Sequence, residues 1–86
     1  ISMTRALARE VAREGINVNA IAPGMVKTEM TAANLAKKLD YYLSRIPLER
    51  IAEPGDIANA AVFLASDAAS YMTGTTMDLT GGMMMR

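Results

Sequence analysis

The sequence predicts an α/β fold in which helices pack on a parallel sheet. Two short and largely apolar stretches, residues 17–22 and 75–79, have the length and pattern of strands. The long connection between them carries apolar residues at helical spacing, and a connection of this kind joins parallel strands rather than a hairpin. The predicted order of elements along the chain is therefore helix, strand, helix, helix, strand.

Residues 1–14 are predicted to form the first helix. Met3, Leu7 and Val11 recur every four residues and make one apolar stripe, beside which arginines form a second stripe. The arginine stripe is interpreted as a solvated face, with a subunit contact as the alternative. Gly15 is expected to end the helix, because glycine readily enters the left-handed conformation found just past helix ends.

The strand predicted over residues 17–22 is expected to stop at Pro23 and Gly24. Proline offers no N–H to a strand ladder, and glycine can adopt a positive φ. Asn17 and Asn19 occupy alternate positions and so point to one face, where we expect them to hydrogen-bond loop backbone near the strand ends.

The loop that follows this strand is the candidate ligand site, because open α/β sheets bind ligands beyond the carboxyl ends of their strands. It offers free backbone amides and the hydroxyl of Thr28 before the next helix. The alternative is that Pro23 and Gly24 only turn the chain, and the spacing alone favours this simpler reading.

The second helix is predicted over residues 31–46, with Thr31 as its cap. Tyr41 and Tyr42 should lie on different faces, one packed and one exposed to solvent. This helix follows a candidate ligand loop, so it is interpreted either as a lid or as plain core packing. Its one-sided apolar stripe consists of Leu35, Leu39, Leu43 and Ile46.

The third helix should begin at Pro54, which suits the first helical position, with Asp56 adding negative charge to the first turn. It is expected to close near Ser66, and residues 67–71 should form one further turn. The second strand, residues 75–79, would then follow.

Composition excludes several classes of function. The chain has 86 residues with nine Lys and Arg against nine Asp and Glu, and its zero net charge gives no electrostatic case for nucleic acid or an anionic membrane as a partner. It has no Cys and no His, so disulfides and the commonest metal ligands are excluded, and no metal site is expected. A reducing, cytoplasmic location is expected. Helical periodicity already runs at Ile1, so we expect the chain to be the downstream part of a longer protein.

A series of short motifs, in a specific order and spacing, resembles the short-chain dehydrogenase/reductase family. The motifs are Met3-Thr4-Arg5-Ala6-Leu7-Ala8-Arg9-Glu10, Gly15-Ile16-Asn17-Val18-Asn19, Ala22-Pro23-Gly24, Thr28-Glu29-Met30, Pro47-Leu48, Arg50, Glu53-Pro54, Ile57-Ala58, Phe63-Leu64-Ala65-Ser66-Asp67, Tyr71-Met72-Thr73-Gly74 and Gly81-Gly82. The resemblance covers essentially the whole chain and is weakest across residues 31–46. It implies that residues 1–86 are the C-terminal part of a single NAD(P)-binding, doubly wound Rossmann-like domain, with a lid at about 28–47.

The resemblance also implies roles for individual residues around bound NAD or NADP. Pro23 and Gly24 match positions that shape the loop beneath the nicotinamide. Val26 matches the position whose backbone amide and carbonyl hold the carboxamide, and Thr28 matches a hydroxyl that bonds the carboxamide or the diphosphate. The residues expected on the substrate side are Met25, Met30 and Leu35.

The catalytic residues of the family are not expected in this chain. The Tyr-x-x-x-Lys motif, the catalytic Ser and Asn and the Gly-rich cofactor turn are absent, and Tyr41, Tyr42 and Tyr71 do not stand in that context. Two smaller departures are Glu49, where the family often has Gly, and Thr80, where it often has Asp.

Two functions are therefore considered. In the first, which the resemblance implies, the chain is part of an NAD(P)-dependent oxidoreductase, similar to 3-oxoacyl-carrier-protein reductases and to sugar or polyol dehydrogenases, that interconverts a small-molecule carbonyl and an alcohol. The resemblance implies a homotetramer or dimer with contacts through residues 1–14, 54–66 and 75–79. The alternative is a non-catalytic truncated fragment that only self-associates, and the isolated chain is expected to be inactive.

Overall fold

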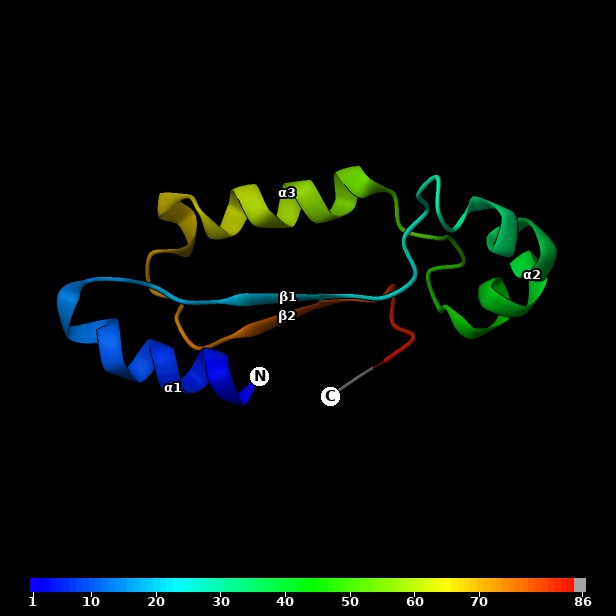
Figure 1. The fold of residues 1–86 in the computed structure, drawn as a ribbon. Coiled ribbons are helices and arrows are strands. Elements are labelled where there is room, and N and C mark those ends of the chain that lie inside the picture. Colours follow the sequence, from blue (N-terminus) through cyan, green and yellow to red (C-terminus); the bar gives the residue numbers. More distant parts are fainter. Residues whose placement is uncertain (85–86) are drawn as a thin grey trace.

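The computed structural model describes residues 1–84, in which two parallel strands lie between helices (Figure 1). β1 (Ala20–Pro23) pairs with β2 (Thr76–Leu79), and the register sets Ala20 opposite Thr76 and Pro23 opposite Leu79. α1 (Ser2–Val11) lies on one side of this pair and α3 (Pro54–Leu64) on the other. The predicted α/β order and the parallel pairing are confirmed.

β1 begins and ends later than the predicted strand over residues 17–22. Pro23 is the last residue of β1. The strand tolerates proline there because the hydrogen bond to β2 at this position is donated by the amide of Gly24. Gly24 N donates to Leu79 O at 2.9 Å, so the N–H that proline lacks is not required there.

Residues 17–19 bind the connection before β2 instead of extending β1. The Asn17 side chain donates to Ser70 O at 2.9 Å, and the Asn19 side chain donates to Met72 O at 3.1 Å. Asn19 Oδ1 also accepts from Thr75 N at 3.1 Å. The prediction that both asparagines satisfy loop backbone is confirmed.

The helix predicted over residues 1–14 has two parts, α1 and a 3₁₀ turn, η1 (Ala12–Glu14). Gly15 follows with φ 75°, the left-handed conformation expected at that position. At the other end of the chain, α3 begins at Pro54 and is followed by η2 (Asp67–Ala69), so the further turn predicted after the third helix is present.

α2 (Ala32–Arg45) lies beyond the carboxyl ends of both strands (Figure 1). Its helical geometry is broken at Lys38, where φ is −122° and ψ is 23°, so it consists of two short helices in sequence. Tyr41 is half exposed and Tyr42 is more buried, as predicted.

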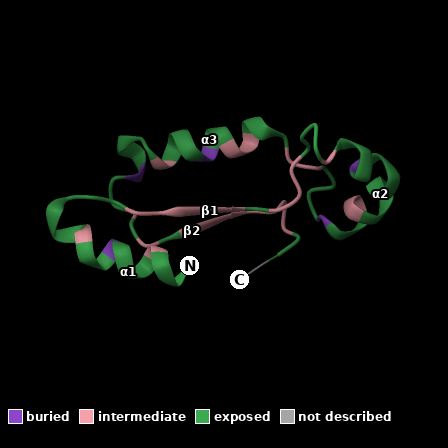
Figure 2. Ribbon diagram, in the orientation of Figure 1, coloured by how far each residue is buried: buried purple, intermediate pink, exposed green. Residues whose placement is uncertain are grey.

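The described residues bury little apolar surface (Figure 2). Both strands are only half-buried. The radius of gyration is 15.3 Å, whereas a compact domain of this length would have about 12 Å. The buried residues are Ala8, Leu35, Ile46, Ala60 and Ala69. The faces of the sheet and helices are therefore left open, with large apolar side chains in solvent.

One backbone position is strained by its residue type. Glu49 has φ 58°, and its amide donates to Ile46 O at 2.8 Å, which closes the turn after α2. An L-residue with a side chain pays about 1–2 kcal/mol for this conformation, and glycine does not.

We expect Glu49→Gly to raise the free energy of unfolding by about 0.5–1 kcal/mol, because relief of the left-handed strain exceeds the added entropy of glycine in the unfolded chain. Urea unfolding measures this. Glu49→Ala is the matched control, since it removes the carboxylate and keeps the strain. Equal midpoints for the glycine and alanine variants would contradict the prediction.

Candidate functional site

The candidate ligand loop leaves the carboxyl end of β1 in close contact with the end of β2. A Cβ atom on Gly24 would lie 3.1 Å from Thr80 Cα and 3.3 Å from Thr80 Cβ. Gly24 does not have a positive φ, so that expectation is wrong. Glycine suits this position because the two backbones approach closely, and a Cβ here would require Thr80 to shift by a few tenths of an ångström.

The next residues are held by a short parallel bridge to the segment before α3. Lys27 N donates to Ala52 O at 2.8 Å, and Ala52 N donates to Met25 O at 3.2 Å. Neither bond uses the backbone of Val26, which lies between them. Within residues 1–84 the Val26 amide has no acceptor, while its carbonyl accepts from Thr31 Oγ1 at 2.9 Å. An N–H and a second carbonyl lone pair remain for a ligand.

Thr28 and Thr31 form a reciprocal pair that fixes the end of this loop. Thr31 N donates to Thr28 Oγ1 at 3.3 Å, and Thr28 N donates to Thr31 Oγ1 at 2.9 Å. This is the arrangement of a capping box with Thr28 in the cap position. The expectation that the Thr31 side chain caps the helix is wrong, because its hydroxyl bonds the preceding loop and makes no cap bond to α2.

The arrangement suits a carboxamide, the group that Val26 and Thr28 are predicted to hold. A carboxamide needs both an acceptor and a donor, and the Val26 backbone offers a free N–H beside its carbonyl. The Thr28 side chain is exposed, and its hydroxyl hydrogen can turn from Thr31 toward a ligand. Pro23 is exposed as well, at the end of β1.

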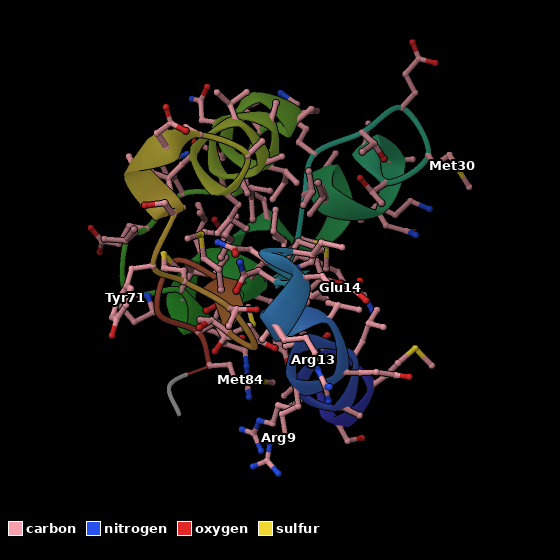
Figure 3. The ribbon with its side chains drawn as sticks, turned by 90° about the vertical axis from the view of Figure 1, so that its left-hand side faces the viewer. Arg9, Arg13, Glu14, Met30, Tyr71 and Met84 are labelled. Atoms are coloured by element: carbon pink, nitrogen blue, oxygen red, sulfur yellow. The ribbon has the colours of Figure 1, made fainter. Side chains whose placement is uncertain are left out.

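The three predicted substrate-side residues do not converge on one cavity. Met25 lines a cavity of about 360 Å³ next to the loop, and Leu35 is buried beside a cavity of about 610 Å³ between α2 and residues 49–53. Met30 is 92% exposed and points away from the rest of the chain (Figure 3). Their common role stays a prediction.

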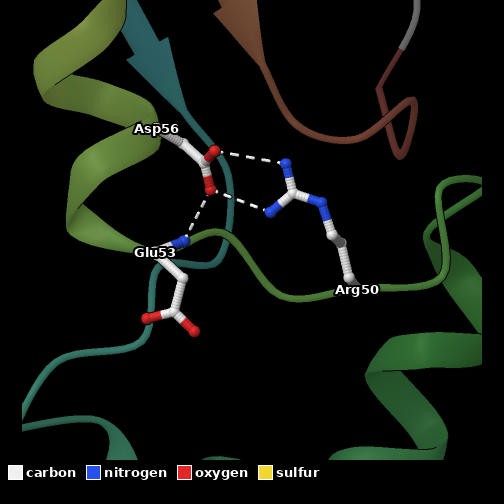
Figure 4. A network of polar contacts seen from close by, with 3 residues as sticks. All are labelled: Arg50, Glu53 and Asp56. Atoms are coloured by element: carbon white, nitrogen blue, oxygen red, sulfur yellow. Dashed lines mark hydrogen bonds and ion pairs between the residues drawn. The ribbon is translucent and has the colours of Figure 1, made fainter.

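An ion pair stabilises the start of α3 at the same edge of the sheet (Figure 4). The Arg50 guanidinium donates to both carboxylate oxygens of Asp56, at 2.9 and 3.2 Å, and Glu53 N donates to Asp56 Oδ2 at 2.8 Å. The hydrogen bonds from Arg50, then that from the Glu53 amide, lower the pKa of Asp56 from 3.8 to about 2. The sequence predicted Asp56 at the helix start and included Arg50 among the family motifs, but the pairing of the two was not predicted, although a cation shortly before Glu-Pro-Gly-Asp was a signal for it.

Arg50 and Asp56 also line a cavity of about 200 Å³ with Met25, Leu79 and Thr80. The pair therefore stands close to where the candidate loop leaves the sheet. Its geometry is bidentate, which matches the planar fork of the guanidinium to the carboxylate. These contacts hold residues 50–53 at the start of α3, and this segment contains Ala52, which pairs with Val26.

The described residues contain no evident catalytic or metal-binding group. Tyr71 is fully exposed and points into solvent (Figure 3). No cluster of three or more acidic side chains within residues 1–84 could hold a metal ion. Across the same residues, no helix has the length and apolar character that crossing a membrane requires.

Asp56 should make stability depend on pH. Its pKa is lower in the folded chain, so its stabilising contribution is present above pH 3.8 and is lost as the pH falls toward about 2. We expect Asp56→Asn to flatten the pH dependence of the unfolding free energy across this interval, measured by urea unfolding. Asp40→Asn, at an exposed carboxylate on α2, is the control. An unchanged slope in Asp56→Asn would contradict the assignment.

Comparison with known proteins places these features in a family. A family profile described as "Enoyl-(Acyl carrier protein) reductase" matches residues 1–84. The chain is 51% identical over 78 residues to an uncharacterized oxidoreductase of Mycobacterium bovis, covering 91% of this chain and 32% of that protein. It is 49% identical over 85 residues to the 3-oxoacyl-[acyl-carrier-protein] reductase FabG of Rickettsia felis, covering 99% of this chain and 35% of that protein.

Solved structures agree. A short-chain dehydrogenase/reductase of Brucella melitensis, described as glucose/ribitol dehydrogenase, superposes with a TM-score of 0.91 at 42% identity, over 99% of this chain and 34% of that one. A protein of Agrobacterium tumefaciens with bound NADP, described as a candidate 2-deoxy-d-gluconate 3-dehydrogenase, gives 0.87 at 46% identity, over 95% and 34%. The chain spans about a third of the length of these relatives. The Rossmann-like α/β prediction is confirmed, and the chain belongs to the short-chain dehydrogenase/reductase family.

Proposed function

We propose that this chain is part of an NAD(P)-dependent oxidoreductase that interconverts a carbonyl and an alcohol, and that it supplies the nicotinamide side of the cofactor site. Family membership and the likeness to an NADP-bound structure support the reaction class. The observation that carries the local role is the Val26 amide. It is held without a protein acceptor, within residues 1–84, at the carboxyl end of a parallel strand.

In this proposal each loop residue has a separate task. The cofactor, when bound, supplies or accepts the hydride. The Val26 amide and carbonyl hold the carboxamide, which orients the nicotinamide ring toward the substrate. Thr28 donates its hydroxyl hydrogen to the same group or to the diphosphate, while Pro23 and Gly24 keep the loop close to β2.

The segment at about 28–47, which contains α2, is proposed as the substrate lid. Its position beyond the strand ends supports this, as does the break at Lys38, which divides it into two halves. Met25, Met30 and Leu35 would face a small carbonyl or alcohol substrate when the lid closes, and in the structure Met30 is exposed while Leu35 is buried.

Oligomer contacts are proposed through residues 1–14, 54–66 and 75–79, in a homotetramer or dimer. Large apolar side chains on these elements are exposed: Met3 by 82% on α1, and Val62 by 69% on α3. A second copy of the enzyme would cover these exposed side chains.

The role of Thr28 can be tested in the complete enzyme. We expect Thr28→Val to raise the cofactor KM roughly three- to tenfold, which is the worth of one neutral hydrogen bond, and to leave the substrate KM nearly unchanged. Steady-state reduction of a ketone by NADH and NADPH measures both constants.

Thr28→Ser, which keeps the hydroxyl, should leave the cofactor KM near its original value. Thr31→Val is a second comparison for Thr28→Val: it breaks the same reciprocal pair from the other side, and it also removes the hydrogen bond from Thr31 Oγ1 to Val26 O. If Thr28 acts only through the helix start, both variants should lose thermal stability and cofactor affinity together. A cofactor KM that rises equally in both, in step with the loss of stability, would contradict a direct contact from Thr28.

The alternative function, a non-catalytic fragment that self-associates, rests on the open apolar faces of the 86-residue chain. We expect this chain by itself to give no NADH or NADPH oxidation with any ketone, because the family's Tyr-x-x-x-Lys motif is not in it. Analytical ultracentrifugation should show a mass that rises with concentration.

Two measurements separate the alternatives. The intact mass of the natural protein, read with the coding sequence before Ile1, shows whether a Tyr-x-x-x-Lys motif and a Gly-rich turn precede this chain. If they do, the enzyme proposal stands. Turnover by the 86 residues alone would contradict the expectation of an inactive fragment.

A further inference from the structure

The cavity beside the candidate loop that Met25 lines is also bordered by an arginine and two tyrosines. It has a volume of about 360 Å³, within the size range of small-ligand pockets. Its residues come from the loop, from the second half of α2 and from the segment after β2. They are Gly24, Met25, Tyr41, Tyr42, Arg45 and Met83.

The guanidinium of Arg45 stacks on an aromatic ring. Its central carbon lies 5.4 Å from the centroid of the Tyr41 ring, a cation–π contact. The rings of Tyr41 and Tyr42 are 5.6 Å apart at an angle of 45°, so one aromatic side chain supports the next. The exposed guanidinium of Arg45 therefore rests against an aromatic surface at the rim of the cavity.

The charge of Arg45 has no carboxylate partner in the described chain. Among residues 1–84 the ion pair is the one between Arg50 and Asp56, and Arg45 is not in it. A cation near the last turn of a helix is favourable to the helix dipole, and this accounts for a positive charge at the end of α2. It does not account for the ordered stacking or for the apolar cavity that Arg45 borders.

We propose that this cavity binds the carboxylate of the substrate, so that the enzyme acts on carbonyl compounds carrying a carboxylate and an apolar body. This inference rests on the proposed function. Arg45 pairs with the carboxylate through its guanidinium fork, and Met25 and Tyr42 contact the apolar body. Since Met25 directly precedes Val26 in the loop, the reacting carbonyl would lie toward the nicotinamide position.

The test compares two ketones that differ only in charge, benzoylformate and its methyl ester, with the complete enzyme and NAD(P)H. We expect Arg45→Gln to lower kcat/KM for benzoylformate about 10- to 100-fold, the range for a charged hydrogen-bonded contact, and to change the ester by about twofold or less. Arg45→Lys should recover only part of the loss, because lysine keeps the charge without the fork. Arg13→Gln, the same charge change at an exposed position outside the proposed lid, should leave both substrates unaffected.

A binding measurement separates this inference from the proposed function. Benzoate and benzamide are titrated into the same enzyme, and the Arg45 side-chain signals are followed by NMR. Benzoate shifting these signals without any ketone reduction would contradict the proposed function and support the carboxylate site. Ketone reduction with equal effects of Arg45→Gln on both substrates, or with no response of Arg45 to benzoate, would overturn the carboxylate site and leave the proposed function intact.

Discussion

The parallel register of β1 and β2 is the constraint on which the rest of the structure depends. It is set before either strand begins, because the side chains of Asn17 and Asn19 bind the backbone of residues 69–75. With Ala20 held opposite Thr76, both strands reach the same edge of the sheet, and their ends lie in contact. A shift by one residue would reverse the faces of one strand and separate the two ends. Two asparagines therefore determine where the proposed ligand loop emerges.

At that edge the loop is ordered by backbone contacts rather than by a core. Gly24 lies against Thr80, the residues around Val26 bridge to Ala52, and the reciprocal threonine pair closes the segment. Arg50 and Asp56 hold the other side of the bridge. Each contact leaves the Val26 amide unused, so the donor is fixed in place before a ligand binds. Order obtained in this way lowers the entropy lost on binding.

The elements could be predicted from sequence because their signals are local. Helical spacing, Gly15 and Pro54 placed the helices within a few residues, and the alternating asparagines correctly indicated contacts to loop backbone. The close approach at Gly24 and the bond from Thr31 to Val26 could not be predicted, because both depend on which segments meet in space. The arrangement of Arg45 over Tyr41 had a readable signal, a cation four residues after an aromatic on one helix, and was overlooked.

The proposed lid is attached to the sheet at both of its ends, and this limits how it can move. Its start is joined to the loop that follows β1, since Thr31 Oγ1 donates to Val26 O at 2.9 Å. Its end is joined to the segment just after β2, since Leu48 N donates to Gly81 O at 3.0 Å and a side chain on Gly81 would collide with Ile46. Lys38 lies between these attachments, with non-helical backbone angles. In the proposed lid, bending at Lys38 would keep both attachments, whereas release at the first one would break the hydrogen bond to Val26 that orders the ligand loop. Such bending would move Leu35, in the first half of α2, and the preceding Met30 relative to Arg45. Arg45 lies in the second half of α2, which would stay next to the segment after β2.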